Sequence, residues 1–156
     1  LLFFLCEIRP RILKIIKMKR RELVSKIMST NLITVNHTNN LFEAEKLFNE
    51  NGIRHIPVVD GERIIGMLSL TDLLRVTFVD EFNSDSSNLD TAVYNMLRIE
   101  QVMAKNVISL SSHQTIKEAV EILAVNEFHA LPVIDNHKLV GIITTTDILN
   151  YLLEQY

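Results

Sequence analysis

The chain contains few residues of several types: its 156 residues include one cysteine, no tryptophan, four glycines and three prolines. Cys6 alone cannot form an intramolecular disulfide, and without a Cys-x-x-Cys pair the usual spacing of a zinc site or a dithiol redox site is missing. The opening apolar run stops at Glu7, which is far too short to span a bilayer. These absences fit a reducing compartment, and we expect a cytoplasmic protein without a membrane span.

The chain also lacks an excess of positive charge and the common catalytic motifs. Its net charge is −3, which gives no general electrostatic case for binding nucleic acid. The five histidines show no metal-ligand spacing such as His-x-x-x-His, and Gly-x-Ser-x-Gly is absent. A hydrophobic fraction of 47% and a charged fraction of 22% are ordinary for a soluble globular protein. We expect no metal site, no catalysis and no nucleic-acid partner.

What the sequence does have is an internal repeat. Residues 24–75 align with residues 99–150 without a gap, and the identical positions include Asp72 and Asp147. One repeat of about 50 residues buries too little surface to be stable alone, so we expect the two repeats to pack as one body. The expected organisation is an N-terminal extension (1–21), a first repeat (22–76), a linker loop and helix (77–98) and a second repeat (99–156).

Residues 1–21 differ from the rest of the chain, because an apolar start is followed by a strongly basic stretch. One interpretation is a basic amphipathic helix that lies on a membrane surface. The other, which we favour because Pro10 interrupts the helical pattern, is a poorly ordered extension. No basic region precedes the apolar run and no clear cleavage site follows it, so we expect no secretory signal.

Each repeat predicts the element order strand, helix, strand, strand, helix. The first helices have clear starts: Thr115-Ile-Lys-Glu118 is a capping box, and Asn40-Leu-Phe-Glu43 is a weaker version of it. Residues 91–103 continue a helical pattern between the repeats. Strands are expected where a proline opens an apolar run, and where the chain returns after a polar two-residue turn. The predicted strands are 32–35, 55–60 and 64–68 in the first repeat and 107–110, 130–135 and 139–143 in the second.

Gly66 and Gly141 fall in the middle of the last predicted strand of each repeat. A glycine inside a strand marks a place where a side chain has no room or where another backbone comes close. We therefore expect a close neighbour at both positions.

A segment with a hydroxyl residue three positions before an aspartate follows this strand in each repeat, at Ser69–Asp72 and Thr144–Asp147. One interpretation is structural: the hydroxyl and the carboxylate cap the helix reciprocally, which needs no ligand. The other is functional, because a helix N-terminus with hydroxyl donors suits a phosphate, and a carboxylate in the first turn can accept from ribose hydroxyls. The sequence leaves both interpretations open.

These marks together resemble the cystathionine-β-synthase (CBS) domain pair, often called a Bateman module. The resemblance covers residues 22–156 and depends on three repeated features. They are Met28 and Met103 before the first strands, the two hydrophobic-Pro-Val-hydrophobic-Asp strands, and Gly-h-h-Ser/Thr-x-x-Asp at 66–72 and 141–147. The resemblance implies an α/β fold in which tandem β-α-β-β-α units pack about a pseudo-twofold axis. It also implies homodimers, and adenosine-containing ligands held in clefts between the units.

The resemblance further implies roles for individual residues. Arg54 and His129, just before the Pro-Val strands, are implied to contact phosphate; the alternatives are a solvated surface arginine and a satisfied interior histidine. Ala130 offers no polar group where the first repeat has His55, so we expect two inequivalent clefts. The other implied contacts are Asp72 and Asp147 for ribose, Ser69, Thr71, Thr144 and Thr146 for phosphate, and Ile33, Thr34, Ile108 and Ser109 near the adenine.

On this resemblance we expect a regulatory module that senses energy or metabolites by binding AMP, ADP, ATP or S-adenosylmethionine. It would require no cofactor and have no catalysis of its own. Its partners would be a second copy of the chain and an unidentified regulated protein. The alternative is a ligand-free dimerisation or interaction module, in which the repeated segments only cap helices.

Overall fold

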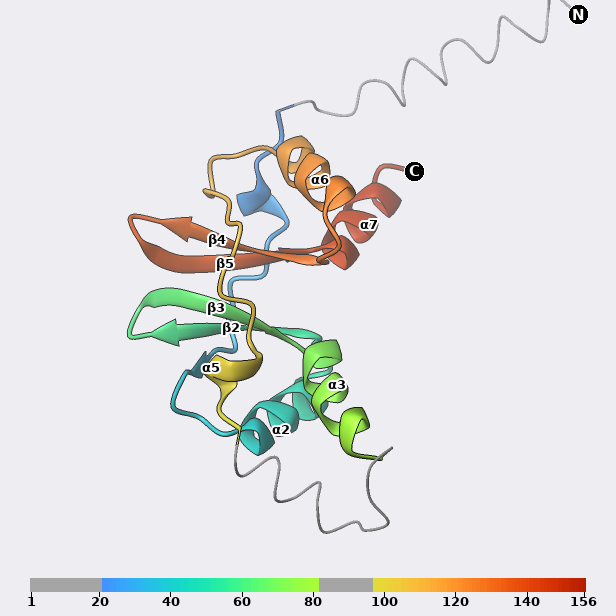
Figure 1. Ribbon diagram of the computed structural model, residues 1–156. Helices are drawn as coiled ribbons and strands as arrows, with labels where there is room; N and C mark the ends of the chain where they lie inside the picture. The colour runs from blue at the N-terminus through green and yellow to red at the C-terminus, as the bar shows by residue number, and fades with distance from the viewer. Residues whose placement is uncertain (1–20, 82–96) are drawn as a thin grey trace, which may run out of the picture.

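The computed structural model describes residues 21–81 and 97–156, which form two α/β units (Figure 1). Residues 1–20 of the predicted extension and residues 82–96 of the predicted linker lie outside the described residues. No helix in the described part of the chain is long and apolar enough to cross a membrane. The elements are, in chain order, η1 (Val24–Lys26), β1 (Val35–Asn36), α2 (Leu41–Asn51), β2 (His55–Asp60), β3 (Arg63–Ser69), α3 (Leu70–Glu81), α5 (Ile99–Val102), α6 (Ile116–Val125), β4 (Ala130–Asp135), β5 (Lys138–Thr144) and α7 (Thr145–Leu153). Of the helix predicted over residues 91–103, residues 91–96 lie outside the described residues, and the described remainder is helical only over α5, with Arg98 as the N-cap and Met103 as the C-cap.

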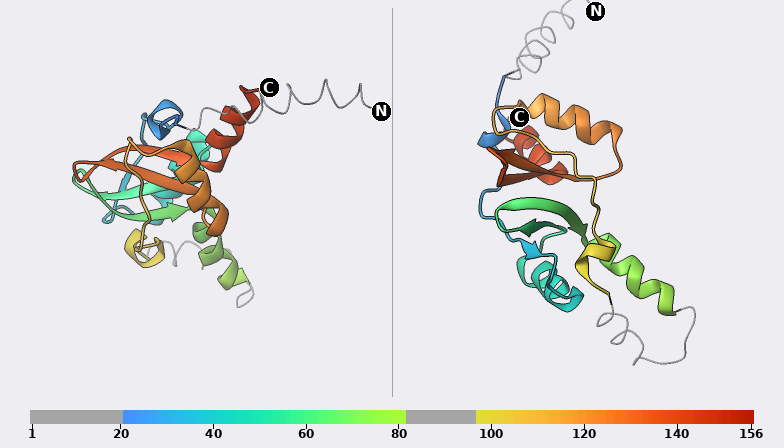
Figure 2. Two further views of the ribbon diagram at one scale, coloured as in Figure 1. Left: turned by 90° about the horizontal axis from the view of Figure 1, so that it is seen from above. Right: turned by 60° about the vertical axis from the view of Figure 1, so that its left-hand side comes forward.

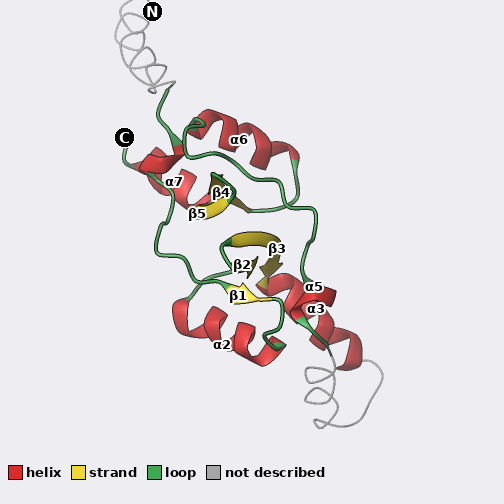
Figure 3. Cartoon of the chain, turned by 90° about the vertical axis from the view of Figure 1, so that its left-hand side faces the viewer, coloured by secondary structure: helices red, strands yellow, loops and turns green. Residues whose placement is uncertain are grey.

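The strands form two small sheets that face each other at the centre of the molecule. β2 pairs antiparallel with β3 and β1 adds to β2 in parallel, while β4 and β5 form a second antiparallel hairpin. The two hairpins share one register, because Pro57 lies opposite Met67 and Pro132 lies opposite Ile142. Helices α2 and α3 cover the outer side of one hairpin, and α6 and α7 cover the outer side of the other (Figure 1, Figure 3). The predicted α/β fold of tandem repeats is confirmed.

The four hairpin strands occur where they are predicted. β2 and β4 have the predicted bounds, and β3 and β5 each extend one residue further at both ends. The turns between them use residues with positive φ, namely Gly61 (61°) in the first repeat and Asn136 (50°) with His137 (64°) in the second. Two consecutive residues with positive φ are what a type I′ hairpin turn requires. Asparagine enters this conformation more easily than most residues.

The first predicted strand of each repeat is wrong in its extent. Only the end of the first run forms a strand, β1, and the second run contributes a single bridge at Leu110. The reason is that these segments cross from one unit to the other: Ser29 N–H donates to the Ile142 carbonyl at 2.9 Å in the second unit, whereas Val35 pairs with Val58 in the first. The backbone between these two points runs between the sheets and joins neither ladder.

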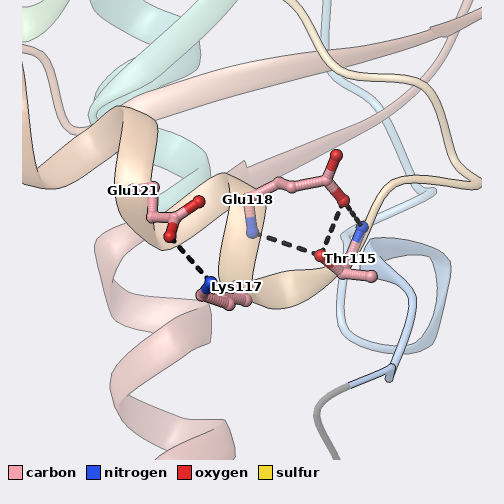
Figure 4. Close-up of polar contacts among 4 residues, drawn as sticks. All are labelled: Thr115, Lys117, Glu118 and Glu121. Atoms are coloured by element: carbon pink, nitrogen blue, oxygen red, sulfur yellow. Dashed lines mark hydrogen bonds and ion pairs between the residues drawn. The ribbon is translucent and has the colours of Figure 1, made fainter.

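Helix α6 begins with the capping box that its sequence predicts (Figure 4). The Thr115 hydroxyl and N–H donate to the Glu118 carboxylate at 2.6 and 2.7 Å, and the same hydroxyl accepts the Glu118 N–H at 3.3 Å. Because these bonds favour the charged carboxylate, they hold the pKa of Glu118 below its usual range. Lys117 and Glu121 form an exposed ion pair at 3.0 Å on the same helix (Figure 4). Helix α2 starts with a complete box at Asn40, so the weaker sequence signal gives the same cap.

Each unit has its own core, and each core contains residues of the other repeat. Val24 is fully buried in the core of the second unit, and Met103 is buried in the core of the first. The Met28 side chain lies against Gly141 and the Met103 side chain lies against Gly66, so an added Cβ at either glycine would collide with a methionine sulfur. The expected close neighbours are therefore confirmed, and both come from the other repeat. This exchange ties the two units together.

Candidate functional site

A cavity of about 1300 Å³ lies between the two units and is lined by both. Typical small-molecule sites have roughly 300–1,000 Å³, so this cavity can hold more than one nucleotide-sized ligand. Its walls are the crossing segments 29–33 and 104–108, the starts of β2 and β4, and the first turns of α3 and α7. Both of these helices start at the same end of the two hairpins (Figure 1, Figure 2).

In the first repeat, the junction between β3 and α3 is closed by a reciprocal cap. The Ser69 hydroxyl donates to the Asp72 carboxylate at 2.5 Å and accepts the Asp72 N–H at 3.1 Å. The Leu70 N–H donates to the Arg54 carbonyl at 2.9 Å, which places Arg54 at the foot of the helix. Arg75, one turn further along α3, lies 3.7 Å from the Asp72 carboxylate. The junction therefore places the Asp72 carboxylate beside Arg75, with the Arg54 backbone at the start of the same helix.

In the second repeat, the junction between β5 and α7 has the same two cap bonds and one more, from the Thr144 N–H. The Thr144 hydroxyl and N–H each donate to the Asp147 carboxylate at 2.7 Å, and the hydroxyl accepts the Asp147 N–H at 3.3 Å. The Thr145 N–H donates to the His129 carbonyl at 3.0 Å. The backbone arrangement of the first repeat is thus reproduced, with a histidine where the first repeat has an arginine.

The structural interpretation of the repeated segment is confirmed, because both aspartates cap helices. In each cap the hydroxyl residue donates to a single carboxylate oxygen, Oδ2. A carboxylate has two oxygens and about four lone-pair sites, so capping does not use up its capacity to accept hydrogen bonds. Both Asp72 and Asp147 also line the cavity, where they can cap a helix and face a ligand at the same time.

All but two of the residues that the resemblance implicates line the cavity. Thr34 and Ser109 are exposed and lie outside the lining. His129 is exposed within the lining, so the alternative of an interior histidine is wrong. Arg54 is exposed at the same cavity, which fits both of its interpretations. The predicted residues that the fold brings together are Ile33, Arg54, Ser69, Thr71, Asp72, Ile108, His129, Thr144, Thr146 and Asp147.

His55, the first residue of β2, is partly buried in the lining and is influenced by charges of both units. Burial lowers the pKa of His55 below its ordinary value of 6.5, and the charge of His129 lowers it further. Within the first repeat, Asp72 raises this pKa and Arg54 lowers it. The pKa of His55 therefore depends on a group of the second repeat as well as on groups of its own repeat.

Sequence reasoning missed two charged residues of the lining, Arg75 and Glu127. Arg75 follows Asp72 at i+3, a spacing at which side chains on a helix are neighbours. Glu127 stands where the first repeat has Gly52. A search for aligned positions at which the charge changes would have found both residues.

The profile of the CBS domain family matches residues 24–78 and 99–154, which is one match in each repeat. Among known proteins, MJ1225 of Methanocaldococcus jannaschii is 29% identical over 137 residues, which cover 86% of this chain and 49% of that protein. Its solved structure has a TM-score of 0.71 at 28% identity, with 90% of this chain and 51% of that chain covered. The chain spans about half the length of MJ1225 and less of two further curated relatives, but 92% of a CBS domain-containing protein of Dictyostelium discoideum that is 29% identical.

Two structures that were solved with adenosyl compounds have the same fold. The CBS domain pair of MJ0100, in complex with 5′-methylthioadenosine and S-adenosyl-L-methionine, has a TM-score of 0.70 at 24% identity and covers 86% of this chain and 98% of that chain. CBSX2, in complex with AMP, has a TM-score of 0.70 at 22% identity and covers 85% and 97%. With a family match in each repeat and the fold of solved CBS domain pairs, this chain belongs to the CBS domain family.

Proposed function

We propose that the cleft between the two repeats binds an adenine nucleotide or a related adenosyl compound, and that the protein is a regulatory module without catalysis of its own. One observation carries the proposal: the two capping aspartates, each beside hydroxyl residues at a helix start, line the same cavity. The ligands of MJ0100 and CBSX2, which share the fold, support this ligand class.

Each helix start offers hydroxyl and carboxylate groups that recognise a ribose, and the lining around the start of α3 adds two arginines for a phosphate. The N-termini of α3 and α7 carry the partial positive charge of the helix dipole, which favours a phosphate. Thr71 and Thr146 are exposed in the lining and add hydroxyl donors. A carboxylate oxygen of Asp72 or Asp147 accepts hydrogen bonds from the ribose hydroxyls. Phosphate and ribose contacts thus come from the first turn of one helix.

The adenine is assigned to the crossing segments. Ile33 and Ile108 line the cavity, and Ile108 is 45% exposed, so its apolar side chain is accessible to a flat ring. Thr34 and Ser109, the neighbours of these isoleucines, are exposed outside the lining, so the proposed contact with the base rests on the isoleucines.

A ligand in this cavity touches two units that exchange parts of their cores, with Val24 in one and Met103 in the other. It shifts the arrangement of the units only if it binds two arrangements with different affinity. A regulated protein that contacts both units would then respond to the ligand. The binding of this protein would in turn change the affinity for the ligand by the same factor. We therefore propose signalling to an unidentified partner protein by a small change between the repeats.

We also propose that a second copy of the chain covers the outer face of α6 and α7. Val120, Ala124 and Leu149 line an apolar groove of about 240 Å³ there, and Leu149 is 60% exposed. Lys117 and Glu121 carry opposite charges on the same helix. In a twofold contact the lysine of one copy meets the glutamate of the other while the apolar faces cover each other, so this surface is self-complementary. Sedimentation is expected to give a dimer for the wild type and a monomer for Leu149→Lys; a wild-type monomer would contradict the contact.

Calorimetric titration with AMP, ADP, ATP, S-adenosylmethionine and NAD tests the ligand class. At least one adenosyl compound is expected to bind the wild type. The double variant Asp72→Asn with Asp147→Asn is expected to bind it at least about tenfold more weakly, because each aspartate supplies a charged acceptor. Asp60→Asn is the matched control, since Asp60 is exposed on β2 and lies outside the lining. Failure of every compound to bind, or full affinity in the double variant, would reject the proposal.

The alternative of a ligand-free dimerisation module is supported by one observation, namely that both caps are complete without a ligand. Under this alternative the same double variant lowers the melting temperature, while no adenosyl compound changes the melting temperature of the wild type. A thermal-shift series with the five compounds therefore separates the two functions.

A further inference from the structure

The charged residues that line the cavity are distributed unevenly between its two halves. The first half, around the start of α3, contains Arg54 and Arg75 against the single carboxylate of Asp72. The second half, around the start of α7, contains Glu127 and Asp147 with His129, and none of the described residues that line it is an arginine or a lysine, whose positive charge is permanent at neutral pH. The two halves therefore differ in the sign of their charge.

This difference comes from positions at which the two repeats carry different residues. Arg75 aligns with Asn150, so the second helix has lost a cation one turn after its capping aspartate. Gly52 aligns with Glu127, so the second repeat has gained a carboxylate just before its Pro-Val strand. Neither change affects the helix caps, which are alike in both repeats.

In the first half, a phosphate at the start of α3 meets two guanidinium groups. Arg75 is 77% exposed, and its Nη1 lies 3.7 Å from the Asp72 carboxylate, a separation longer than a hydrogen bond. Its guanidinium is therefore not fixed by this ion pair and can turn to a phosphate, for which a planar fork of donors is well suited. Arg54 lies at the foot of the same helix.

In the second half, a phosphate at the start of α7 meets two carboxylates. Glu127 is exposed in the lining, and Asp147 is held in the first turn by its cap. Like charges at close range raise the free energy of a bound phosphate, whereas a ribose and an adenine carry no charge and are unaffected. The second half thus keeps its groups for ribose but repels phosphate.

We propose that this charge difference sorts ligands by their phosphate. A phosphate-bearing nucleotide binds in the first half, where Arg75 determines specificity, and Glu127 excludes phosphates from the second half, which accepts phosphate-free adenosyl compounds that are neutral or cationic. The inference rests on the proposed adenosyl-binding function. The volume of about 1300 Å³ leaves room for both ligands at once.

Calorimetry with AMP and with adenosine, which differ only in the phosphate, tests the inference. The wild type is expected to bind one AMP. Arg75→Asn, which places the second repeat's residue in the first, is expected to weaken AMP binding about tenfold and leave adenosine binding unchanged. Arg63→Asn is the control, because Arg63 is an exposed arginine outside the lining.

The reverse exchange, Glu127→Gly with Asn150→Arg, gives the second half the residues of the first. This variant is expected to bind two AMP molecules. Circular dichroism checks whether the variant is folded, and if it is unfolded, the Arg75→Asn result alone decides the test. Two equal AMP sites in the wild type, or undiminished AMP affinity in Arg75→Asn, would overturn the inference and leave the proposed function standing. A wild type that binds neither AMP nor adenosine would also overturn the inference, whereas only the failure of all the adenosyl compounds to bind would remove the proposed function as well.

Discussion

The junctions that start α3 and α7 have the same cap, but they stand in surroundings of different charge. Ser69 with Asp72 and Thr144 with Asp147 make the same reciprocal bonds, and the residue before each Pro-Val strand accepts a helix N–H in both repeats. Only the first junction has Arg75 beside it. The caps satisfy a need of the backbone, which is the same in each repeat. The surrounding charges are not required by the backbone. We therefore attribute their difference to the ligands that the two halves of the cavity bind.

The largest expected effect concerns the two strand glycines, whose surroundings differ. At Gly66 an added Cβ would meet the Met103 side chain and, at 3.1 Å, the Ala104 backbone carbonyl, whereas at Gly141 the three nearest atoms all belong to the Met28 side chain. Gly66→Ala is therefore expected to lower the free energy of unfolding by about 1–3 kcal/mol, and Gly141→Ala by less, because a side chain gives way more easily than a backbone. Urea unfolding of both variants measures the difference.

A double-mutant cycle with the methionines sharpens this prediction. Met28→Ala is expected to remove the cost of Gly141→Ala almost fully, while Met103→Ala relieves Gly66→Ala only in part because the Ala104 carbonyl stays in place. Equal costs at the two glycines, or no coupling with either methionine, would show that the exchanged segments do not pack as described.

The next effect concerns the two caps, which are expected to be equal in strength. Ser69→Ala and Thr144→Ala each remove an N-cap side chain, so each is expected to cost about 0.5–2 kcal/mol of stability. Thr144→Ser keeps the hydroxyl and serves as the control. Chemical denaturation checks the costs, and a loss confined to one repeat would break the equivalence of the two junctions.

The smallest effect is a pH dependence that only the first repeat contributes, because Ala130 stands where the first repeat has His55. Burial and the charge of His129 lower the pKa of His55, with Arg54 acting in the same direction and Asp72 opposing it. The unfolded chain therefore takes up a proton at a higher pH than the folded chain does. The contribution of neutral His55 to the stability of the fold is fully present above about pH 6.5 and is lost as the pH drops through its lowered pKa.

His55→Gln is expected to reduce this fall of the melting temperature between about pH 7.5 and about pH 5, since it removes the titrating group. His113→Gln is the control, because His113 is exposed and lies outside the lining. A melting temperature that falls equally in the wild type and in His55→Gln would assign the dependence to other groups.

Much of the fold could be predicted from local signals that need no tertiary information. The bounds of β2 and β4 follow from a proline at the start of an apolar run and a polar turn at its end, and the start of α6 follows from its capping box. The first strands could not be predicted in the same way. Residues 32–34 have the right composition for a strand, but they run between the two units. Only the tertiary arrangement shows that no strand pairs with them.

The site shows the same division. Asp72 and Asp147 could be found because they occupy the same position in both repeats, and identical positions are easily recognised in an internal alignment. Arg75 and Glu127 could not be found in that way, because they occur where the repeats differ. Their role becomes visible only when the fold brings them into one lining with the caps.

The most direct test of the central claim is a calorimetric titration of AMP into the wild type, Asp72→Asn and Asp147→Asn. The claim is that one cavity carries two ligand sites of unequal charge, built on equal helix starts. It predicts that the wild type binds one AMP, that Asp72→Asn loses this binding, and that Asp147→Asn retains it. Equal losses in both variants, or no AMP binding by the wild type, would contradict it.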